Sequence, residues 1–438
     1  MLYCEPPMRI LHVVQRYWPY TGGSERHLQE IAERQARDGH SVTIYTTDAF
    51  DLELFWSRDA RRIPPLSEEH NGVAIRRFPV RHLPWPRWSF PGVRFGMTLL
   101  SGLPVDATPL LRRLAPLAPR VPDLVRELRQ TAERFDVVHG MNICFESLLY
   151  PAYEFARRTG AGFVLTPLTH LGEGDGDRVR RYYTMRHQVR LNAAADAVLA
   201  QTDVEIEYLA ARGVPRGKLV RAGVGVNPEE VTGGDPTRFH AKHGVSGPFV
   251  FYAGTAAYDK GTFHLVEAMR RLWQAGEPAD LVLAGPTLRA FREHYERLPH
   301  DVRSRCHVLG FIPEEDKRDL FAAGSVLAMP SRTDSFGIVY LEAWLNGKPV
   351  VGALAGGVPE VIADGVDGYL VPFGDVEALA DRLSRLLRSP DEAARLGRVG
   401  REKTLAHFTW DSIYPRVREV YDRLWQARAR DRASTSRR

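Results

Sequence analysis

The chain has 438 residues and a net charge of +5, and its hydrophobic and charged contents of 44% and 26% are typical of soluble globular proteins. It contains no apolar run of the ~18 residues that a membrane span needs, no signal-peptide pattern and no metal or disulfide spacing among its three cysteines, so we expect a cytoplasmic protein of two or three domains. No nucleic-acid recognition motif accompanies the basic charge, so we expect no nucleic-acid partner.

The first half of the chain alternates short apolar runs with segments of helical spacing. Strands are expected at 9–14, 41–47, 136–141, 162–168 and 196–202. The segment 24–40 has the pattern of a helix, with Ser24 placed to cap it and Gly39 to end it. Continuous apolar strands alternating with helices predict an open, doubly wound parallel sheet.

The pattern is interrupted at residues 221–239, which are rich in Gly, Pro and Asp, and we take this segment as the domain boundary. Further strands are expected at 248–254, 279–285, 305–311, 325–331 and 348–353, with helices at 262–276, 314–324 and 337–347. The predicted domains are residues 1–225, 226–408 and a C-terminal segment, 409–438. In that segment Trp410, Ile413, Val417, Val420, Tyr421 and Leu424 form a helical stripe expected to lie on the body of the protein, and residues 431–438 are expected to be disordered.

Residues 76–125 interrupt the first domain with a basic, proline-rich segment that we predict to be irregular. From Arg76 to Arg129 there are ten arginines, nine prolines and three acids. One interpretation is a solvated connection. The other is a surface for anionic lipid or a lipid-linked acceptor, formed by Trp85, Trp88 and Phe90 beside Arg87 and Arg94.

Two glycine-containing turns follow strands and precede helices, as anion-binding turns do. Gly22 and Gly23 lie in the first domain, and in the second Gly254 ends a strand six residues before Lys260. Backbone N–H groups at such a turn can approach a phosphate, and a lysine can neutralise a diphosphate. A turn without ligand and a solvated lysine remain the alternative interpretations. The lack of G-x-G-x-x-G at the first turn argues against an NAD-dependent dehydrogenase.

The stretch DSFGIVYLE, residues 334–342, has a carboxylate at each end of a loop-to-helix turn. The N–H groups at the start of the predicted helix suit a phosphate. Asp334, before the helix, can reach sugar hydroxyls, and Glu342, more than one turn inside it, suits a ribose diol, because carboxylates accept hydrogen bonds from neighbouring hydroxyls. The alternative is two acids without a shared partner.

Residues 330–375 resemble the donor-site region of the family-4 retaining glycosyltransferases, whose hallmark is Glu, seven residues, Glu. GGSERH, DVVHG, ADAVLAQT, AGTAAYDKG, LVLAGP and LGFIPEEDKRDLFAAGSV agree in order, so the resemblance covers nearly the whole chain and is weakest from about Phe55 to Leu124. It implies two Rossmann-like domains facing each other across a cleft (the GT-B fold) and a metal-independent transfer from a nucleotide diphosphate sugar to a glycan or lipid-linked acceptor. It also implies biosynthesis of a cell-surface polysaccharide or glycoconjugate and no cofactor besides the donor. The lipid-binding interpretation of residues 76–125 would place the protein peripherally on the inner face of the membrane.

Carried over position by position, the resemblance implies catalytic or binding roles for the following residues. The diphosphate is met by Lys260, Thr255, Gly22 and Gly23, and the transferred sugar and phosphates by Asp334, Ser335, Phe336, Gly337 and Ile338. Glu342 binds the ribose, and Phe311 and Ile312 face the base. His139 or His170 lines the sugar and acceptor side.

The chain departs from the family pattern at three places. Asp334 replaces the first Glu of the hallmark, Thr255 stands where an arginine usually pairs with the lysine, and Met141 replaces a second histidine. These changes leave open a catalytically weak homologue that only binds nucleotide-sugar or glycan, and an epimerase on the same fold is a further alternative. Asp175 and Asp177 resemble a metal-binding Asp-x-Asp motif, but their glycine-rich loop in the first domain argues against it, and we expect no metal.

Overall fold

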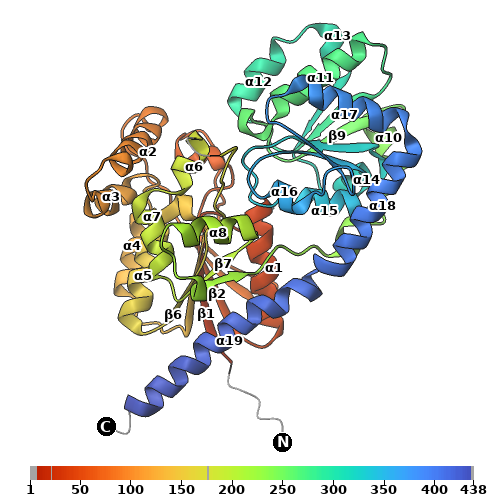
Figure 1. The fold of residues 1–438 in the computed structure, drawn as a ribbon. Helices are drawn as coiled ribbons and strands as arrows, with labels where there is room; N and C mark the ends of the chain where they lie inside the picture. Colours follow the sequence, from red (N-terminus) through yellow and green to blue (C-terminus); the bar gives the residue numbers. More distant parts are fainter. Residues whose placement is uncertain (1–6, 21, 175–176, 436–438) are drawn as a thin grey trace, which may run out of the picture. The chain divides into compact units, whose positions relative to one another are not determined.

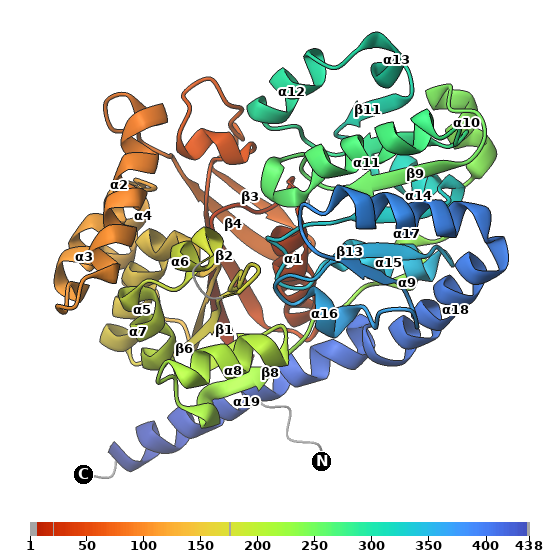
Figure 2. The ribbon, with the colours of Figure 1, turned by 45° about the horizontal axis from the view of Figure 1, so that its top comes forward.

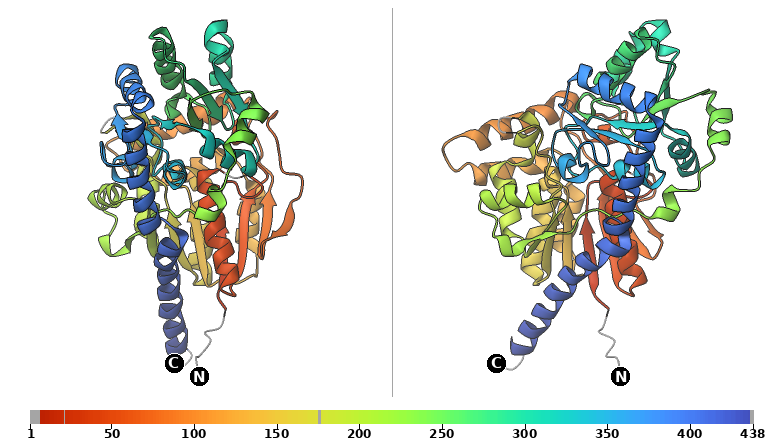
Figure 3. Two further views of the ribbon diagram at one scale, coloured as in Figure 1. Left: turned by 90° about the vertical axis from the view of Figure 1, so that its right-hand side faces the viewer. Right: turned by 45° about the vertical axis from the view of Figure 1, so that its right-hand side comes forward.

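The computed structural model describes residues 7–20, 22–174 and 177–435 and divides the chain into two compact units. The first unit is built from the described residues of Met1–Thr169, Arg178–Gly223 and Tyr414–Arg438, and the second from those of His170–Asp177 and Val224–Ile413 (Figure 1). Each unit is therefore discontinuous in the sequence, and each has a parallel sheet with helices on both faces (Figure 3).

The sheet of the first unit has eight strands in the order β3-β4-β2-β1-β5-β6-β7-β8. The strands are β1 (Arg9–Val13), β2 (Ser41–Thr47), β3 (Ser67–His70), β4 (Val73–Phe78), β5 (Val137–Met141), β6 (Gly162–Thr166), β7 (Ala197–Ala200) and β8 (Leu219–Arg221). Only β3 is antiparallel to its neighbour. The five predicted strands are confirmed, and the edge strands β3 and β8 escaped prediction because one is polar and the other has three residues.

The helices of the first unit are α1 (Gly23–Arg37), α2 (Pro86–Gly102), α3 (Thr108–Leu114), α4 (Pro122–Gln130), α5 (Glu146–Thr159), α6 (Arg178–Tyr183), α7 (Arg186–Ala194), α8 (Asp203–Ala211) and most of α19 (Trp410–Thr435). Four 3-10 turns accompany them, η1 (Leu52–Phe55), η2 (Ala115–Leu117), η3 (Ile143–Phe145) and η4 (Arg216–Lys218).

The start of α1 differs from the prediction. Its N-cap is Gly22, and Ser24 lies inside the first turn, where its hydroxyl donates to Glu25 Oε2 at 2.8 Å. A Cβ at Gly22 would lie 2.5 Å from side-chain atoms of Tyr20 and Glu25, so the close packing of this turn excludes a larger cap residue. Gly39, at φ +91°, ends the helix as predicted.

The prediction that residues 76–125 are irregular is wrong, because most of them belong to β4 and to helices α2, α3 and α4. Pro86, Pro109 and Pro122 occupy the first turn of these helices, where the missing N–H is not needed. A series of prolines that looked like helix breakers therefore marks successive helix starts.

The sheet of the second unit has six parallel strands in the order β11-β10-β9-β12-β13-β14 (Figure 2). They are β9 (Phe249–Ala253), β10 (Asp280–Ala284), β11 (Cys306–Gly310), β12 (Val326–Met329), β13 (Val350–Ala353) and β14 (Tyr369–Val371). The helices are α9 (Pro228–Val231), α10 (Pro236–His243), α11 (Thr262–Gln274), α12 (Arg289–Glu296), α13 (His300–Arg303), α14 (Glu314–Ala323), α15 (Ile338–Leu345), α16 (Val358–Val361), α17 (Val376–Arg388) and α18 (Pro390–His407), with one 3-10 turn, η5 (Tyr258–Lys260). The predicted class of two doubly wound α/β domains is confirmed.

The last helix, α19, contributes to both units. Trp410 packs in the second, where a Cβ at Gly225 would lie 2.6 Å from its ring. In the first, Tyr414 donates to Asp38 Oδ2 at 2.7 Å, and Tyr421 is buried. The helix continues to Thr435, past the point at which we predicted disorder, and the last three residues lie outside the described ones.

None of the helices within the described ranges has both the length and the apolar composition that spanning a membrane requires.

Candidate functional site

The carboxyl ends of the parallel strands in the second unit bring two predicted site residues into contact. Lys260 follows β9, and Asp334 follows β12, the strand next to it in the sheet. Lys260 Nζ lies 2.8 Å from Asp334 Oδ1 and 3.2 Å from the carbonyl oxygen of Thr333. Loops at this edge of a doubly wound sheet are where such folds bind ligands.

The charges of this pair are shielded from water. Burial alone would raise the pKa of Asp334, but the ammonium of Lys260 holds that pKa below its ordinary value. His170, which belongs to this unit, interacts electrostatically with both residues, and burial followed by repulsion from Lys260 lowers its pKa to about 3. At neutral pH the cluster therefore consists of one cation, one anion and one neutral imidazole.

Glycines allow the loops of this edge to approach each other closely. Gly261 has φ +76°, and a Cβ there would lie 2.1 Å from the carbonyl oxygen of Pro330. Gly337, at φ +90°, is the N-cap of α15 and provides no side chain to the N–H groups of its first turn. Gly356 N donates to the carbonyl oxygen of Gly172 at 2.8 Å, which holds the segment containing His170 against the loop after β13.

Glu342 lies in the second turn of α15, and its side chain is only 8% exposed. Lys317 Nζ, from α14, donates to Oε1 at 2.7 Å. Among the described residues Oε2 has no hydrogen-bond partner, although it is buried. An unsatisfied buried carboxylate oxygen is costly and calls for an explanation such as a ligand hydroxyl.

The other predicted residues of the second unit lie in the same set of loops. Phe311 and Ile312 follow β11, and the Phe311 side chain is exposed. Phe336 is buried against the ring of Phe408, with ring centroids 5.5 Å apart, so only its backbone can face a ligand. Ser335 and Ile338, half-buried, flank the N-cap of α15. The carbonyl oxygen of Thr255 accepts a hydrogen bond from Tyr252 Oη at 2.8 Å.

His139, in contrast, belongs to the core of the first unit, and its role beside the sugar remains a prediction. The residue is fully buried on β5, opposite His12 of β1. Its Nδ1 lies 2.7 Å from Tyr421 Oη and 3.1 Å from His12 Nδ1, and its Nε2 lies 2.8 Å from Thr166 Oγ1. Both ring nitrogens are thus engaged with protein groups, and burial holds the pKa well below its ordinary value.

Gly22 and Gly23 form the start of α1 in the first unit. The turn is supported by Glu25, which is buried and receives hydrogen bonds from Arg16 Nε at 3.0 Å and Gln15 Nε2 at 3.1 Å. The contact of these glycines with a diphosphate remains a prediction.

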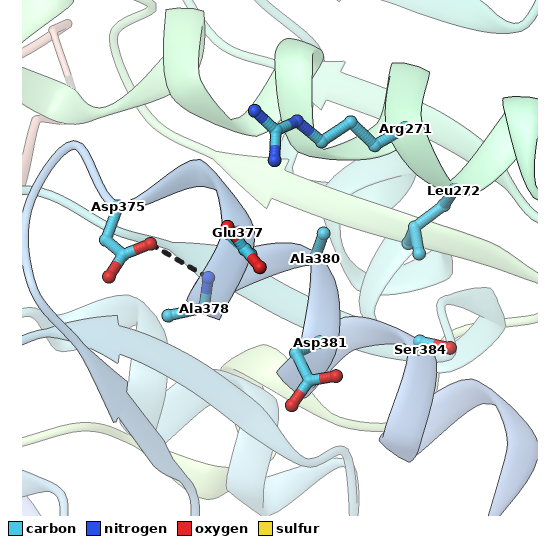
Figure 4. A pocket seen from close by; sticks show the side chains of 8 residues that line it. All are labelled: Arg271, Leu272, Asp375, Glu377, Ala378, Ala380, Asp381 and Ser384. Carbon is cyan, nitrogen blue, oxygen red and sulfur yellow. Dashed lines mark hydrogen bonds between the residues drawn. The ribbon is translucent and has the colours of Figure 1, made fainter.

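The predicted site residues do not line the hollows found on the two units. In the second unit a hollow of about 620 Å³ lies between α11 and α17, bordered by Arg271, Leu272, Asp375, Glu377, Ala378, Ala380, Asp381 and Ser384 (Figure 4). In the first unit a hollow of about 460 Å³ is bordered by the proline-rich segment and α4. The candidate site is therefore defined by the strand-end loops.

No group of three or more His, Cys, Asp and Glu side chains suited to a metal ion occurs in the part of the chain that the structure describes. Asp175 of the Asp-x-Asp motif lies outside the described residues.

Two site contacts were not predicted from the sequence. Lys317 is 25 positions from its partner Glu342, and only the packing of α14 beside α15 joins them. Arg332, in the loop before Asp334, pairs with Asp259 at 2.7 Å and with Glu173 at 3.4 Å. A basic residue in the loop before the first acid was visible in the sequence, but its partners were not.

Comparison with known proteins also divides the chain into two parts, near the boundary between the two structural units. A family model described as "Glycosyl transferase 4-like domain" matches residues 22–225, and one described as "Glycosyl transferases group 1" matches residues 235–403. A D-inositol 3-phosphate glycosyltransferase of Xylanimonas cellulosilytica is 35% identical over 52% of this chain and 57% of its own length, so the match spans little more than half of that relative. An MMP alpha-(1->4)-mannosyltransferase of Mycolicibacterium hassiacum is 25% identical over 95% of this chain and 98% of its own.

Solved structures share the fold. A sucrose-phosphate synthase from Thermosynechococcus elongatus has a TM-score of 0.72 at 21% identity, covering 96% of this chain and 100% of its own. The Anabaena protein HepE, in complex with UDP-glucose, has a TM-score of 0.69 at 20% identity, covering 95% and 99%.

Proposed function

Since this chain belongs to the group 1 glycosyl transferases and has a glycosyl transferase 4-like N-terminal half, we propose that it transfers a sugar from a nucleotide diphosphate sugar to a hydroxyl group of a glycan or glycolipid, with retention of the anomeric configuration. Lys260 and Asp334 lie on loops that follow neighbouring strands of one sheet, and Glu342 lies on α15, the helix after the second of these loops. This grouping is the observation that carries the proposal. The complex of HepE with UDP-glucose, on the same fold, supports a donor of this class.

In the proposed donor complex the diphosphate takes over the ammonium of Lys260. Lys260 now neutralises Asp334 at 2.8 Å. A diphosphate carries more charge than one carboxylate and competes for this cation, and the uncapped N–H groups of α15 offer it a second positive site. Asp334 is then released to accept hydrogen bonds from the hydroxyls of the transferred sugar. The lysine–aspartate pair of the empty site thus becomes two separate ligand contacts.

We assign the remaining donor contacts by position. Glu342 Oε2 accepts a ribose hydroxyl, because it is a buried oxygen with no hydrogen-bond partner among the described residues. The backbone at Phe311 and Ile312 faces the base, and Gly22 and Gly23 close on the diphosphate. His170 is neutral at pH 7, so its imidazole can hydrogen-bond to a sugar hydroxyl without adding charge beside Lys260.

The proposed reaction replaces one bond at the anomeric carbon by another on the same face. The bond from this carbon to the phosphate oxygen breaks, and the bond to the acceptor oxygen forms. The acceptor proton passes to the departing phosphate oxygen, so the products are a glycoside and a nucleoside diphosphate. Lys260 and the start of α15 stabilise the charge that develops on the phosphate, and no step is assigned to a metal or another cofactor.

A donor screen with product analysis tests this proposal. The protein is incubated with nucleotide diphosphate sugars and glycan or glycolipid acceptors, nucleoside diphosphate release is measured, and the anomeric configuration of the product is read by NMR. Lys260→Met should reduce turnover at least 100-fold, since removing one charge-stabilising donor costs about 10²–10³. Lys242→Met is the control, because Lys242 of α10 forms a comparable ion pair with Asp316 of α14, with Nζ and Oδ1 2.7 Å apart.

Three outcomes would contradict the proposal. An inverted product would refute retention. Donor binding without transfer to any acceptor would favour a nucleotide-sugar binding protein, and conversion of donor without acceptor would favour an epimerase.

A further inference from the structure

Large exposed apolar side chains are concentrated on a small part of the first unit. Of the fourteen exposed large hydrophobic residues found in the described part of the chain, seven lie between residues 85 and 110. They are Trp85, Trp88, Phe95, Leu99, Leu103, Val105 and Leu110. Because single exposed apolar residues are common but contiguous groups are not, this concentration marks an interaction surface, which we call the α2–α3 surface.

Three of these residues form one stripe on α2. Trp88, Phe95 and Leu99 are separated by seven and four positions, which places them on the same side of the helix. The opposite side contains Arg94 and Met97, which are buried. Figure 1 shows α2 and α3 at the outer edge of their unit.

The buried side of α2 is firmly attached, so the exposed stripe is not the result of a loosely placed helix. The guanidinium of Arg94 pairs with Glu146, and both side chains are nearly inaccessible to water. His187 Nε2 and Gln188 Nε2 lie 3.1 and 3.2 Å from the same carboxylate. A buried and multiply bonded ion pair of this kind fixes the rotation of the helix about its axis.

Trp85 has a backbone conformation that is unfavourable for a bulky residue, and its side chain is largely exposed. It is the N-cap of α2 with φ +47°, a region that bulky residues rarely adopt, and its side chain is 80% exposed. Trp88, one turn on, is 81% exposed. Backbone strain that presents a tryptophan to solvent is typical of functional positions.

The charges of this segment are almost all positive. Residues 85–114 include four arginines and a single acid, Asp106, which pairs with Arg190 at 2.9 Å. Arg94 is buried against Glu146, and Arg87 and Arg112 pair with Asp59 and Glu154 at 2.9 and 2.7 Å. Arg113 on α3 is exposed. Arg186 donates to the carbonyl oxygens of Leu103 and Val105 and so supports the loop between the two helices.

We propose that the α2–α3 surface docks on an anionic lipid bilayer, with the indoles of Trp85 and Trp88 in the headgroup region and the exposed Arg113 beside phosphate groups. Tryptophan is the side chain that prefers the boundary between water and lipid, and arginine adds attraction to anionic headgroups. The inference rests on the proposed function only for the nature of the acceptor, and it can be tested without sugar transfer.

The test is sedimentation with sucrose-loaded vesicles of phosphatidylcholine alone or with 30% phosphatidylglycerol, at low and high salt. We expect binding to the anionic vesicles, reduced severalfold by high salt. The double variant Trp85→Ser, Trp88→Ser should lose at least about tenfold in partition coefficient. The control is Leu66→Ser combined with Val204→Ser, two exposed apolar residues of the same unit outside the surface, which should bind like the wild type.

A second measurement reports the contact directly. Brominated lipids should quench the fluorescence of the wild type, and the double variant should lose this quenching. Thermal unfolding confirms that both variants are folded, and nucleoside diphosphate binding, measured without lipid, tests the proposed function separately. Failure of the wild type to bind anionic vesicles would overturn the inference. Equal binding of the double variant to anionic vesicles would also overturn it. So would a wild-type dimer that becomes a monomer only in the double variant, since the surface would then contact a second copy of the chain.

Discussion

Replacing Glu342 by glutamine tests whether its carboxylate binds the ribose of a nucleoside diphosphate. Lys317 occupies Oε1 at 2.7 Å, which leaves the buried Oε2 for a ligand. A hydrogen bond to a charged group contributes about 1.5–3 kcal/mol, so the loss of one should weaken binding about 10- to 150-fold. Loss of two would weaken it by the square of that factor. One hydrogen bond is therefore the expectation from the structure.

Titration calorimetry with UDP, GDP, ADP and CDP identifies the nucleotide and gives the dissociation constants. Glu277→Gln is the matched control, because Glu277 is an equally buried acid of the same unit that pairs with Arg388 at 3.4 Å. The 2′-deoxy and 3′-deoxy forms of the nucleotide sharpen the test. Because Lys317 occupies Oε1, only Oε2 can accept a ribose hydroxyl, so only one of the two deoxy nucleotides should bind more weakly than the parent nucleotide. In Lys317→Met both oxygens are available, and both deoxy nucleotides should bind more weakly.

The reasoning is refuted if Glu342→Gln binds the nucleotide within threefold of the wild type. It is also refuted if Glu277→Gln loses as much affinity, because the effect would then come from loss of a buried charge anywhere in the unit. Unfolding without ligand separates either result from misfolding.

Acid should destabilise the first unit, because burial lowers the pKa of His12 and His27 to about 4 and that of His139 well below its ordinary value. The unfolded chain takes up protons below about pH 6.5 and the folded unit does not, so stability that is present above this pH is lower at pH 5.5, by roughly 1 kcal/mol per histidine. Urea unfolding at pH 7.5 and 5.5 measures this, and equal midpoints would contradict it. Gly261→Ala should cost stability and nucleotide affinity, since its Cβ meets a carbonyl oxygen at 2.1 Å, whereas Gly276→Ala, at φ +83° with no atom within 4 Å, should cost only about 1 kcal/mol. Equal effects of the two substitutions on nucleotide binding would show that the close approach at Gly261 has no role.

Most of the parallel strands could be predicted, because each of these is a short apolar run buried on both faces and the local pattern contains the whole signal. Lys260 and Asp334 were each assigned to the donor side from their positions after strands, but their pairing was not predicted, because the local pattern does not contain the order of the strands in the sheet. Where the side chains around a residue come from distant segments, the sequence was insufficient. His139 lies in the middle of β5, and its neighbours are His12 and Tyr421, which is 282 positions away.

The helices of residues 86–130 were missed for a different reason. Proline predicts a break when its position in the helix is unknown, yet at the first turn it is favourable, and only the structure reveals which case applies. Lys317 was not singled out from the sequence, because nothing in the local sequence indicates which residue of another helix it will contact.

The discontinuity of the first unit has a consequence for synthesis of the chain. Tyr414 and Tyr421 of α19 complete this unit by hydrogen bonds to Asp38 and His139, and Gly162 leaves space against Leu424. The first 223 residues emerge from the ribosome nearly two hundred residues before these partners do. Until then His139 lacks the hydroxyl of Tyr421 as a partner, and part of the unit stays uncovered. The N-terminal half of the protein can therefore reach its final state only after the C-terminal half has been made.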